Sequence, residues 1–428
     1  MKRVLIVTYY WPPSGGPGVQ RWLKFVKYLR QFNIEPIVVT VDEKKASYPV
    51  FDNSLESEIP EGIKVYRTNS FEPLKLFSSV FKKEKVPYAG IPDRDKMSFI
   101  GKTSLYIRAN YFIPDARKGW NKYAFKKCCE IIESEKIDAV ITSSPPHSTQ
   151  LIGLQLKEKY NLKWLVDLRD PWTEIYYYDK FHHTERAKKI DLKYETDVLN
   201  KSDFITVTSE QTASRFAKKL VGDPKKISVI TNGFDEEDFS NIHLLPQEKF
   251  TITFLGTINI QFGIEHFVEA ILQVKKNHPN IPLRLKFVGN MDLATRSLLE
   301  SKFFDCIELI EYVPHKESIQ HICSAQLLLL VIPKGKNEGT VPGKTFEYMA
   351  AKRNILCLAP KDSSAGKIIE SSATGKSFLH EDVSGIAAYI SEMMLRWEQG
   401  DDCSVNNNNF KQYSRQNQTA LLAQLLNS

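Results

Sequence analysis

The residues best suited to chemistry stand between positions 337 and 350, where the chain reads NEGTVPGKTFEYMA. This stretch follows an apolar run of strand length, and Gly343, Lys344 and Thr345 would open a helix behind it. Backbone N–H groups, the helix dipole and an ammonium group would then face a diphosphate. Glu347 lies one turn further on the same face, where a carboxylate can accept two ribose hydroxyls. The alternative is that Glu347 only stabilises the helix dipole.

Two glycine-containing turns could bring the backbone close to an anion. Residues 11–18 read WPPSGGPG, and Gly15, Gly16 and Gly18 would let N–H groups approach a phosphate at the start of the next helix. A tight connector without a ligand is the alternative. The turn is neither a G-x-G-x-x-G fingerprint nor a P-loop, which counts against dinucleotide-binding proteins and kinases. Gly256 ends another predicted strand and could approach the same phosphates.

Charged and titratable residues follow two further predicted strands. Arg169 and Asp170 come directly after a strand at 164–167, where buried charges are costly unless they are paired or face a cleft. They either form a structural ion pair or bind sugar hydroxyls or a phosphate. His147 ends the sequence SSPPH and could act as an acid, a base or a hydrogen-bond donor. A helix-capping or surface role is its alternative.

Alternating strands and helices must position these loops. In the first half of the chain we expect strands at 4–8, 36–41, 63–66, 139–142, 164–167 and 204–208, and helices at 20–32, 122–134 and 147–160. In the second half we expect strands at 252–255, 283–288, 327–332 and 355–358, and helices at 263–277, 318–324 and 343–351. This alternation predicts an α/β protein with two tandem Rossmann-like domains. Ligands of such sheets bind at the carboxyl ends of the strands, so we expect a site in an interdomain cleft.

The polar, turn-forming stretch between 232 and 248 is typical of a domain junction, and we place the boundary near Leu244. The predicted domains are therefore 1–244 and 245–400. Residues 401–428 would form an acidic, Asn-rich tail and a closing helix.

Composition excludes several classes of protein. The chain has 428 residues, 42% of them hydrophobic and 25% charged, which excludes a disordered, collagenous or coiled-coil protein. Its six cysteines lack the spacing of a metal knuckle or a disulfide framework, and we expect a reducing cytosol. We find no apolar run of about 18 residues and no signal peptide, so a membrane role would be peripheral.

The positive charge is concentrated in one segment. Residues 74–127 contain 13 basic and four acidic residues, a net charge of +9 in a chain whose total is +7. Aromatic residues are interleaved with them, which suits an anionic membrane surface or a lipid-diphosphate acceptor. An ordinary solvated insertion is the alternative. Nucleic acid would also suit such a segment, but the chain has no nucleic-acid-binding motif, and we expect no nucleic-acid partner.

Four motifs in a fixed order resemble one family. They are Gly15 to Gly18 with Arg21, Asn232 to Asp235, Gly256 with Thr257, and Phe346 to Ala350. Together they are similar to glycosyltransferases of the GT-B fold, close to family 4 and to the bacterial enzymes that build polysaccharides. The resemblance covers nearly the whole chain.

The resemblance implies a nucleotide-sugar donor bound mainly by the C-terminal domain, with Glu347 on the ribose and with Gly343 and Lys344 near the diphosphate. It implies an acceptor, either a glycan or a lipid-linked sugar, on the N-terminal domain, near the Gly15 to Gly18 loop and Arg21. Family 4 enzymes retain anomeric configuration and need neither a metal nor a cofactor, because cationic side chains and helix dipoles neutralise the leaving diphosphate.

The chain departs from the family pattern at three places. Where family 4 commonly has a first glutamate, this chain has Gly339 preceded by Glu338, and we assign both to the donor site. Thr257 and Phe262 replace an arginine and a lysine, so Lys344 would carry the phosphate charge. Arg169-Asp170 stands where many members have His-Asp.

These observations predict a cytoplasmic glycosyltransferase with Asp170, Arg169 and His147 as its catalytic residues. Peripheral attachment to the inner face of the membrane is a further expectation. Two alternatives stay open. One is a nucleotide-sugar epimerase of the same fold, and the other is a non-catalytic partner that binds a nucleotide or a glycan.

Overall fold

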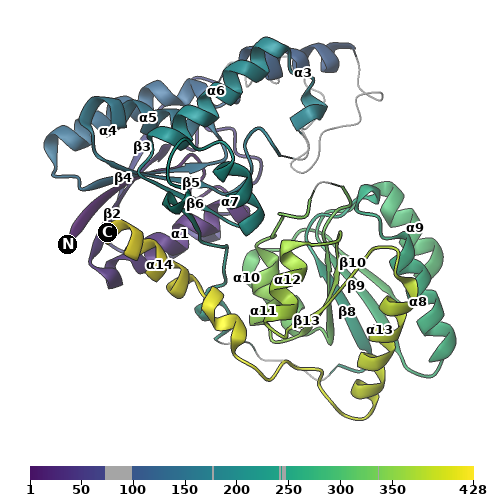
Figure 1. Ribbon diagram of the computed structural model, residues 1–428. Coiled ribbons are helices and arrows are strands. Elements are labelled where there is room, and N and C mark those ends of the chain that lie inside the picture. The colour runs from purple at the N-terminus through teal and green to yellow at the C-terminus, as the bar shows by residue number, and fades with distance from the viewer. Residues whose placement is uncertain (73–98, 176–177, 241, 243–246, 336) are drawn as a thin grey trace. The chain divides into compact units, whose positions relative to one another are not determined.

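The computed structural model describes the chain except for residues 73–98, 176–177, 241, 243–246 and 336. The chain forms two compact units (Figure 1). The first unit consists of Met1–Thr231 together with Gln418–Ser428, and the second unit of Asn232–Asn417. None of the described helices has the length and apolar character needed to span a membrane.

The first unit is built on a parallel sheet of seven strands in the order β3-β2-β1-β4-β5-β6-β7. Its central strands are almost entirely buried, which is why they read as continuous apolar runs in the sequence. The strands are β1 (Lys2–Val7), β2 (Ile34–Val41), β3 (Lys64–Thr68), β4 (Ala139–Ser144), β5 (Lys163–Leu168), β6 (Phe204–Val207) and β7 (Ile227–Val229).

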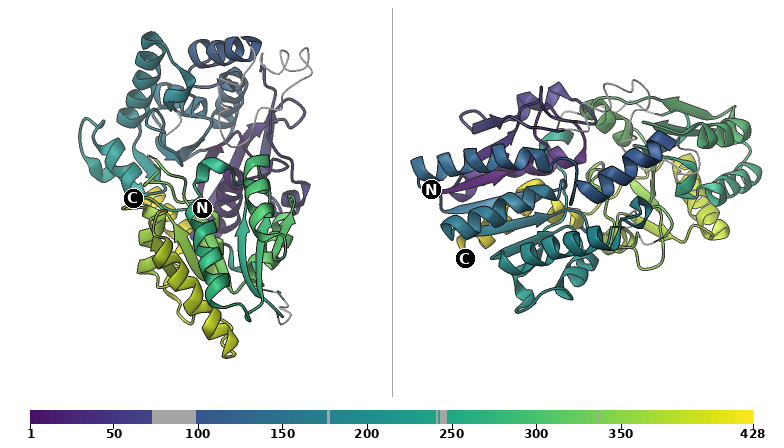
Figure 2. Two further views of the ribbon diagram at one scale, coloured as in Figure 1. Left: turned by 90° about the vertical axis from the view of Figure 1, so that its right-hand side faces the viewer. Right: turned by 90° about the horizontal axis from the view of Figure 1, so that it is seen from above.

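Helices cover both faces of this sheet (Figures 1 and 2). On one face, Trp22 and Phe25 of α1 pack in a single core with Leu422 and Leu426 of α14. The other face carries α4, α5 and α6 over a second core. The helices of the unit are α1 (Pro17–Leu29), α3 (Phe99–Tyr111), α4 (Asn121–Ser134), α5 (Ser148–Tyr160), α6 (Glu185–Lys201), α7 (Glu210–Ala217) and α14 (Arg415–Asn427), of which α14 belongs to this unit from Gln418 on.

The second unit repeats this architecture with six parallel strands in the order β10-β9-β8-β11-β12-β13. They are β8 (Phe250–Leu255), β9 (Leu283–Val288), β10 (Ile307–Ile310), β11 (Leu327–Val331), β12 (Asn354–Leu358) and β13 (Gly375–Phe378). One core contains residues of α8 (Glu265–Asn277), α9 (Leu293–Phe303) and α13 (Val383–Glu398). The other contains residues of α10 (His315–Cys323), α11 (Lys344–Ala350) and α12 (Ser364–Ser371).

The predicted fold class is confirmed: both sheets are parallel and both have the Rossmann-like strand order. In each sheet the strand order reverses beside the first strand, between β1 and β4 and between β8 and β11. Ligands of doubly wound sheets bind at such switch points, outside the carboxyl ends of the strands. A ligand-binding site is therefore expected in the loops that follow these four strands.

The compact units are divided earlier in the chain than the junction that we placed near Leu244, a residue that lies outside the described residues. Phe234 already pairs with the second unit's Tyr413 and Arg415 through backbone hydrogen bonds. The segment 401–428 is not a separate tail, because its last helix packs into the first unit. Of the basic segment 74–127, residues 74–98 lie outside the described residues.

Candidate functional site

Loops after β1, β4 and β5 bring the predicted residues of the first unit together. A Cβ atom added to Gly18 would lie 2.7 Å from Nη1 of Arg169. The Arg169 side chain is held there by two hydrogen bonds, from Nε to the carbonyl oxygen of Ser144 (3.0 Å) and from Nη2 to that of Pro145 (3.1 Å). The guanidinium group therefore lies against the glycine turn that begins α1.

Asp170 lies next to this guanidinium in the chain but forms no ion pair with it in the described part of the structure. Its carboxylate also has no hydrogen-bond partner among the described residues, and the residue is only partly buried. Burial raises the pKa of Asp170, although the positive charge of Arg169 counteracts the shift. The structural Arg169–Asp170 ion pair that the sequence left open is thus not formed.

His147 lies immediately before α5 and does not cap it. The N-terminus of α5 is capped by Asp115, which accepts hydrogen bonds from the backbone N–H (2.7 Å) and the hydroxyl (2.8 Å) of Ser148. The His147 ring instead stacks on Trp172, with centroids 4.7 Å apart and planes 12° apart, and its Nδ1 is buried without a partner. Burial lowers the pKa of His147 to about 4, so the imidazole is neutral at physiological pH.

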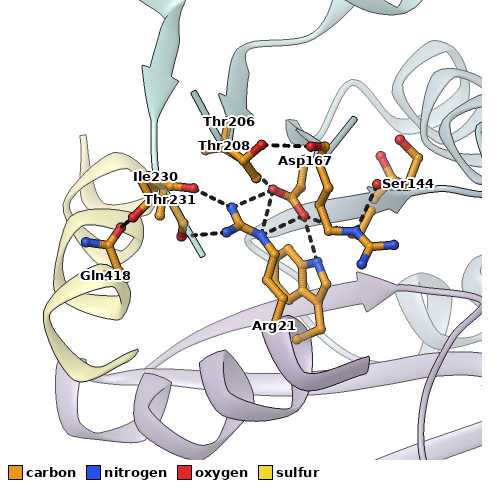
Figure 3. A network of polar contacts seen from close by, with 12 residues as sticks. Arg21, Ser144, Asp167, Thr206, Thr208, Ile230, Thr231 and Gln418 are labelled. Atoms are coloured by element: carbon orange, nitrogen blue, oxygen red, sulfur yellow. Dashed lines mark hydrogen bonds and ion pairs between the residues drawn. The ribbon is translucent and has the colours of Figure 1, made fainter. Parts of the chain in front are cut away.

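Arg21 is not part of the glycine turn's surface, contrary to our expectation. Its side chain is fully buried and bonded to Asp167, with Nη2 to Oδ1 at 2.9 Å, and to the carbonyl oxygens of Ile230 (2.9 Å) and Thr231 (2.8 Å) (Figure 3). Burial alone would raise the pKa of Asp167, but the charge and hydrogen bonds of Arg21 outweigh it and hold that pKa below its usual value. Arg21 therefore stabilises the first unit from within.

Within the glycine turn, the backbone N–H of Gly15 is already used within the protein, because it donates to the carbonyl oxygen of Val50 at 2.9 Å. Gly16 has a φ of 96°, in the region that favours glycine, and precedes α1 without a side-chain cap. Gly16 and Gly18 are thus the two glycines of this turn that remain candidates for contact with a ligand.

Exchange of Gly18 for alanine is expected to lower activity without unfolding the protein. The added methyl group meets only the far end of the flexible Arg169 side chain, which can move aside at little cost in stability. Losing one charged hydrogen-bond donor from the site predicts a drop of about tenfold in the rate of the sugar transfer that the sequence leads us to expect. We expect the same loss in Arg169→Ala and no further loss in the double variant. A melting temperature that falls along with the rate would argue for a merely structural turn.

In the second unit, Lys344 spans the switch point between β8 and β11. Its Nζ donates to the carbonyl oxygen of Leu255, the last residue of β8, at 2.9 Å and lies 4.0 Å from the centroid of the Phe254 ring. A Cβ atom on Gly256, whose φ of 115° favours glycine, would lie 3.6 Å from the same Nζ. Burial lowers the pKa of Lys344 to about 7, although the Glu347 carboxylate favours the charged form.

Glu347 lies one turn further along α11, as predicted, with 22% of its side chain exposed. Its Oε1 lies 3.1 Å from Nε2 of His315, the first residue of α10. The next residue, Tyr348, is buried and its hydroxyl accepts the backbone N–H of Leu255 at 2.8 Å, which fixes α11 to the end of β8. Lys344 and Glu347 thus stand on a helix that is anchored at the site.

The remaining residues that we predicted to bind the nucleotide sugar differ in how far they are exposed. Gly343 precedes α11 and has open space where a Cβ would stand. Thr345 stays a prediction as a ligand residue; its side chain is fully buried and its N–H donates to the carbonyl oxygen of Pro342 at 3.0 Å. Thr257, Glu338 and Gly339 lie partly exposed in the loops after β8 and β11, and the carbonyl oxygen of Glu338 accepts the N–H of Ser364.

Three contributors were not identified from the sequence: His315, the Phe254 ring and the Tyr348 hydroxyl. Tyr348 stands inside the motif Phe346 to Ala350, and Phe254 lies in the expected strand at 252–255, so these positions were an available signal. His315 gave no signal, since it comes from a different helix. No group of three or more His, Cys, Asp or Glu side chains that could hold a metal ion occurs in the part of the chain that the structure describes.

Part of the chain is similar to a known protein family. Residues 91–238 match the model of the family described as Glycosyltransferase Family 4. No curated protein sequence matches the chain.

Solved structures share the fold over the full length. Anabaena Alr3699/HepE in complex with UDP-glucose is similar with a TM-score of 0.63 and 10% identity over 100% of both chains. A glycosyltransferase from Rickettsia africae ESF-5 has a TM-score of 0.62 and 15% identity over 99% of this chain and 97% of its own. An S. aureus TarM mutant in complex with Fondaparinux, alpha-GlcNAc-glycerol and UDP has a TM-score of 0.62 and 12% identity over 100% of both chains. The shared fold and the family match at residues 91–238 confirm the resemblance read from the sequence motifs: the chain has the fold of these structures, and this segment is similar to glycosyltransferases of family 4.

Proposed function

We propose that the chain transfers a sugar from a nucleoside diphosphate sugar, bound by the second unit, to a glycan or lipid-linked acceptor, bound by the first unit, in the synthesis of a cell-surface polysaccharide. The observation that carries the proposal is the Lys344 ammonium beside Gly256, with Glu347 one turn away. Because α11 has only seven residues, these side chains support the proposal better than the helix dipole does. The solved complexes with UDP-glucose and with UDP support the same class of donor.

In this proposal, the Lys344 ammonium neutralises the diphosphate as it leaves and the Glu347 carboxylate accepts hydroxyls of the ribose. The bond between the anomeric carbon and the phosphate oxygen breaks, and the acceptor oxygen bonds to the same carbon. The acceptor proton passes to the leaving phosphate, and the configuration is retained. No step requires a metal.

We assign the acceptor to Arg169, Asp170 and His147 of the first unit. Asp170 offers a carboxyl group without a hydrogen-bond partner among the described residues, and His147 offers a neutral imidazole. Both can bind sugar hydroxyls. Arg169, held against Gly18, supplies positive charge for a phosphate of a lipid-linked acceptor.

A thermal-shift panel of UDP, GDP and ADP tests the donor site, because a ligand at 100 times its dissociation constant adds about 2.7 kcal/mol of stability. We expect one nucleotide to stabilise the wild type and Lys376→Met, and to stabilise Lys344→Met much less. Lys376 is the matched control, since it is an exposed lysine of edge strand β13 paired with Glu392. A panel in which all three nucleotides act alike would contradict the proposed site.

The products distinguish the two alternatives. Incubation with the preferred donor alone gives an epimer if the protein is an epimerase. If the protein is a non-catalytic partner, the donor is not turned over with any acceptor. The proposed transferase gives slow donor hydrolysis alone and a glycosylated product with an acceptor.

We further propose that the basic segment 74–127 holds the protein at an anionic membrane surface. Among its described residues, Tyr106 and Tyr111 of α3 are 46% and 75% exposed, as aromatic side chains at a lipid interface would be. Flotation with vesicles is expected to recover the protein only when anionic lipid is included, and less of it as salt is raised. Equal recovery with neutral vesicles would remove this part of the proposal.

A further inference from the structure

Glu347 shares a hydrogen bond with a residue to which no role is yet assigned. Nε2 of His315 lies 3.1 Å from Oε1 of Glu347, and the two side chains are 20% and 22% exposed. Both groups can therefore be reached by a ligand, while neither is simply a surface group. When Nε2 carries the proton it donates to Oε1, and a carboxylate can accept hydrogen bonds from several donors at once.

Both side chains stand on elements that are fixed by packing. α10 and α11 lie side by side in the second unit (Figure 1). Ile319 and Ile322 of α10 share a buried core with Phe346 and Met349 of α11. The first turn of α10 is closed by a hydrogen bond from the Ser318 hydroxyl to the carbonyl oxygen of His315 at 2.6 Å. The imidazole thus acts on the carboxylate from a rigid position.

We propose that His315 is a positioning residue that holds the Glu347 carboxylate in place for the ribose of the donor, and thereby makes the site prefer ribonucleotides to 2′-deoxyribonucleotides. This inference rests on the proposed function. A free glutamate side chain samples several rotamers, and the bond to His315 selects one of them before the nucleotide arrives. The ribose hydroxyls then meet an acceptor that is already oriented.

The test uses the full chain and the nucleoside diphosphate that gives the largest shift in the panel of UDP, GDP and ADP, together with its 2′-deoxy form. Calorimetry gives Kd for both. We expect His315→Ala to weaken binding of the ribonucleotide about tenfold and to change binding of the deoxynucleotide less than about twofold, since one hydrogen bond to a charged group is lost. The ratio of the two Kd values then approaches that of Glu347→Ala.

Three further variants separate positioning from a general effect on the fold. His315→Gln keeps a donor at a similar distance and is expected to restore the ratio to within about threefold of the wild type. His321→Ala, on the same helix and next to Glu317, is the matched control and should leave the ratio unchanged. His315→Ala combined with Glu347→Ala should be no worse than Glu347→Ala alone, because both act through one carboxylate.

An unchanged ratio in His315→Ala, or equal weakening of both nucleotides, overturns the role of His315 while the proposed function stands. If no nucleoside diphosphate binds the wild type, the proposed function fails and this inference fails with it. Melting of each variant without a ligand checks that the second unit is folded.

Discussion

Asp167→Asn is expected to destabilise the first unit by about 3–5 kcal/mol, because it leaves the fully buried Arg21 guanidinium without its counter-charge. Asp167 also accepts hydrogen bonds from the Trp22 indole (2.9 Å) and from the hydroxyls of Ser143 (2.8 Å) and Thr206 (2.9 Å). An asparagine can accept at only one side-chain oxygen, so some of these buried donors lose their partner.

Urea unfolding followed by tryptophan fluorescence measures this loss. Five of the six tryptophans lie in the first unit, at positions 11, 22, 120, 164 and 172, so the signal reports mainly on that unit. Asp197→Asn is the matched control, because Asp197 pairs with Lys193, whose side chain is 71% exposed. This substitution should lower the free energy of unfolding by less than about 1 kcal/mol. Equal midpoints for the two variants would mean that the buried pair contributes nothing.

The effect of Asp167→Asn should depend on pH in a defined direction. The pKa of Asp167 lies below its usual value in the folded protein, so the folded state holds this proton less tightly than the unfolded chain does. Its contribution is therefore fully present above the unfolded pKa of about 3.9 and is lost as the pH falls through the lower, folded pKa. The difference in the free energy of unfolding between the wild type and Asp167→Asn should be constant from pH 5 to 8 and decrease below about pH 4.

Lys344→Met is expected to weaken binding of the preferred nucleoside diphosphate roughly a hundredfold at pH 7 while stabilising the unliganded protein. The loss of affinity corresponds to about 2.7 kcal/mol, the scale of one hydrogen bond between charged groups. The gain in stability arises because the folded protein binds this proton less tightly than the unfolded chain, given a pKa of about 7 against an ordinary 10.5. Methionine has a side chain of similar length and removes the free-energy cost of burying the ammonium group.

The pH dependence distinguishes this account from a simple loss of contact. The free energy of unfolding of the wild type should rise with pH between 7 and about 10.5, because in this range the unfolded chain keeps the Lys344 proton that the folded protein has lost. The stability difference between Lys344→Met and the wild type should therefore become smaller over the same range. Affinity for the nucleotide should move the other way and fall by about tenfold per pH unit above 7 as the ammonium deprotonates. Between pH 7.5 and 9 the phosphates stay ionised, since their second pKa is near 6.

Calorimetry of the wild type in buffers of different ionisation enthalpy should show proton uptake on binding at pH 8, and no uptake in Lys344→Met. Lys376→Met should behave as the wild type in affinity, stability and proton uptake. Affinity that stays constant from pH 7.5 to 9 in the wild type would show that the Lys344 ammonium does not meet the phosphates.

The sequence was informative where burial is continuous. β11 reads LLLLV and is buried throughout, so its position could be predicted, together with the loop behind it and the helix that carries Lys344 and Glu347. The strands that went unrecognised, β7, β10 and β13, are short and their residues mostly half-buried, so they leave no apolar run. These strands extend the sheets at their edges, where a pattern of burial is weakest.

The sequence could not separate site residues from structural ones of the same type. Arg21 was placed with a ligand because the family resemblance implied it, but its partner Asp167 is 146 positions away and gives no local signal. The same limit hid His315, which meets Glu347 only after α10 and α11 have packed. Motifs predict which loops carry the chemistry, whereas tertiary contacts decide which side chains of those loops face outward.

The return of residues 418–428 to the first unit has a consequence for biosynthesis. Leu422, Ala423 and Leu426 are buried in a core that also contains Trp22 and Phe25, and the Lys2 ammonium donates to the carbonyl oxygen of Leu426 at 2.9 Å. On the ribosome, residues 232–417 are translated as one uninterrupted stretch and can fold as soon as they emerge. The part of the polypeptide that is made first must wait until residues 418–428 have been translated before its own interior is complete, so a nascent chain that lacks them would expose tryptophan-rich apolar surface to chaperones.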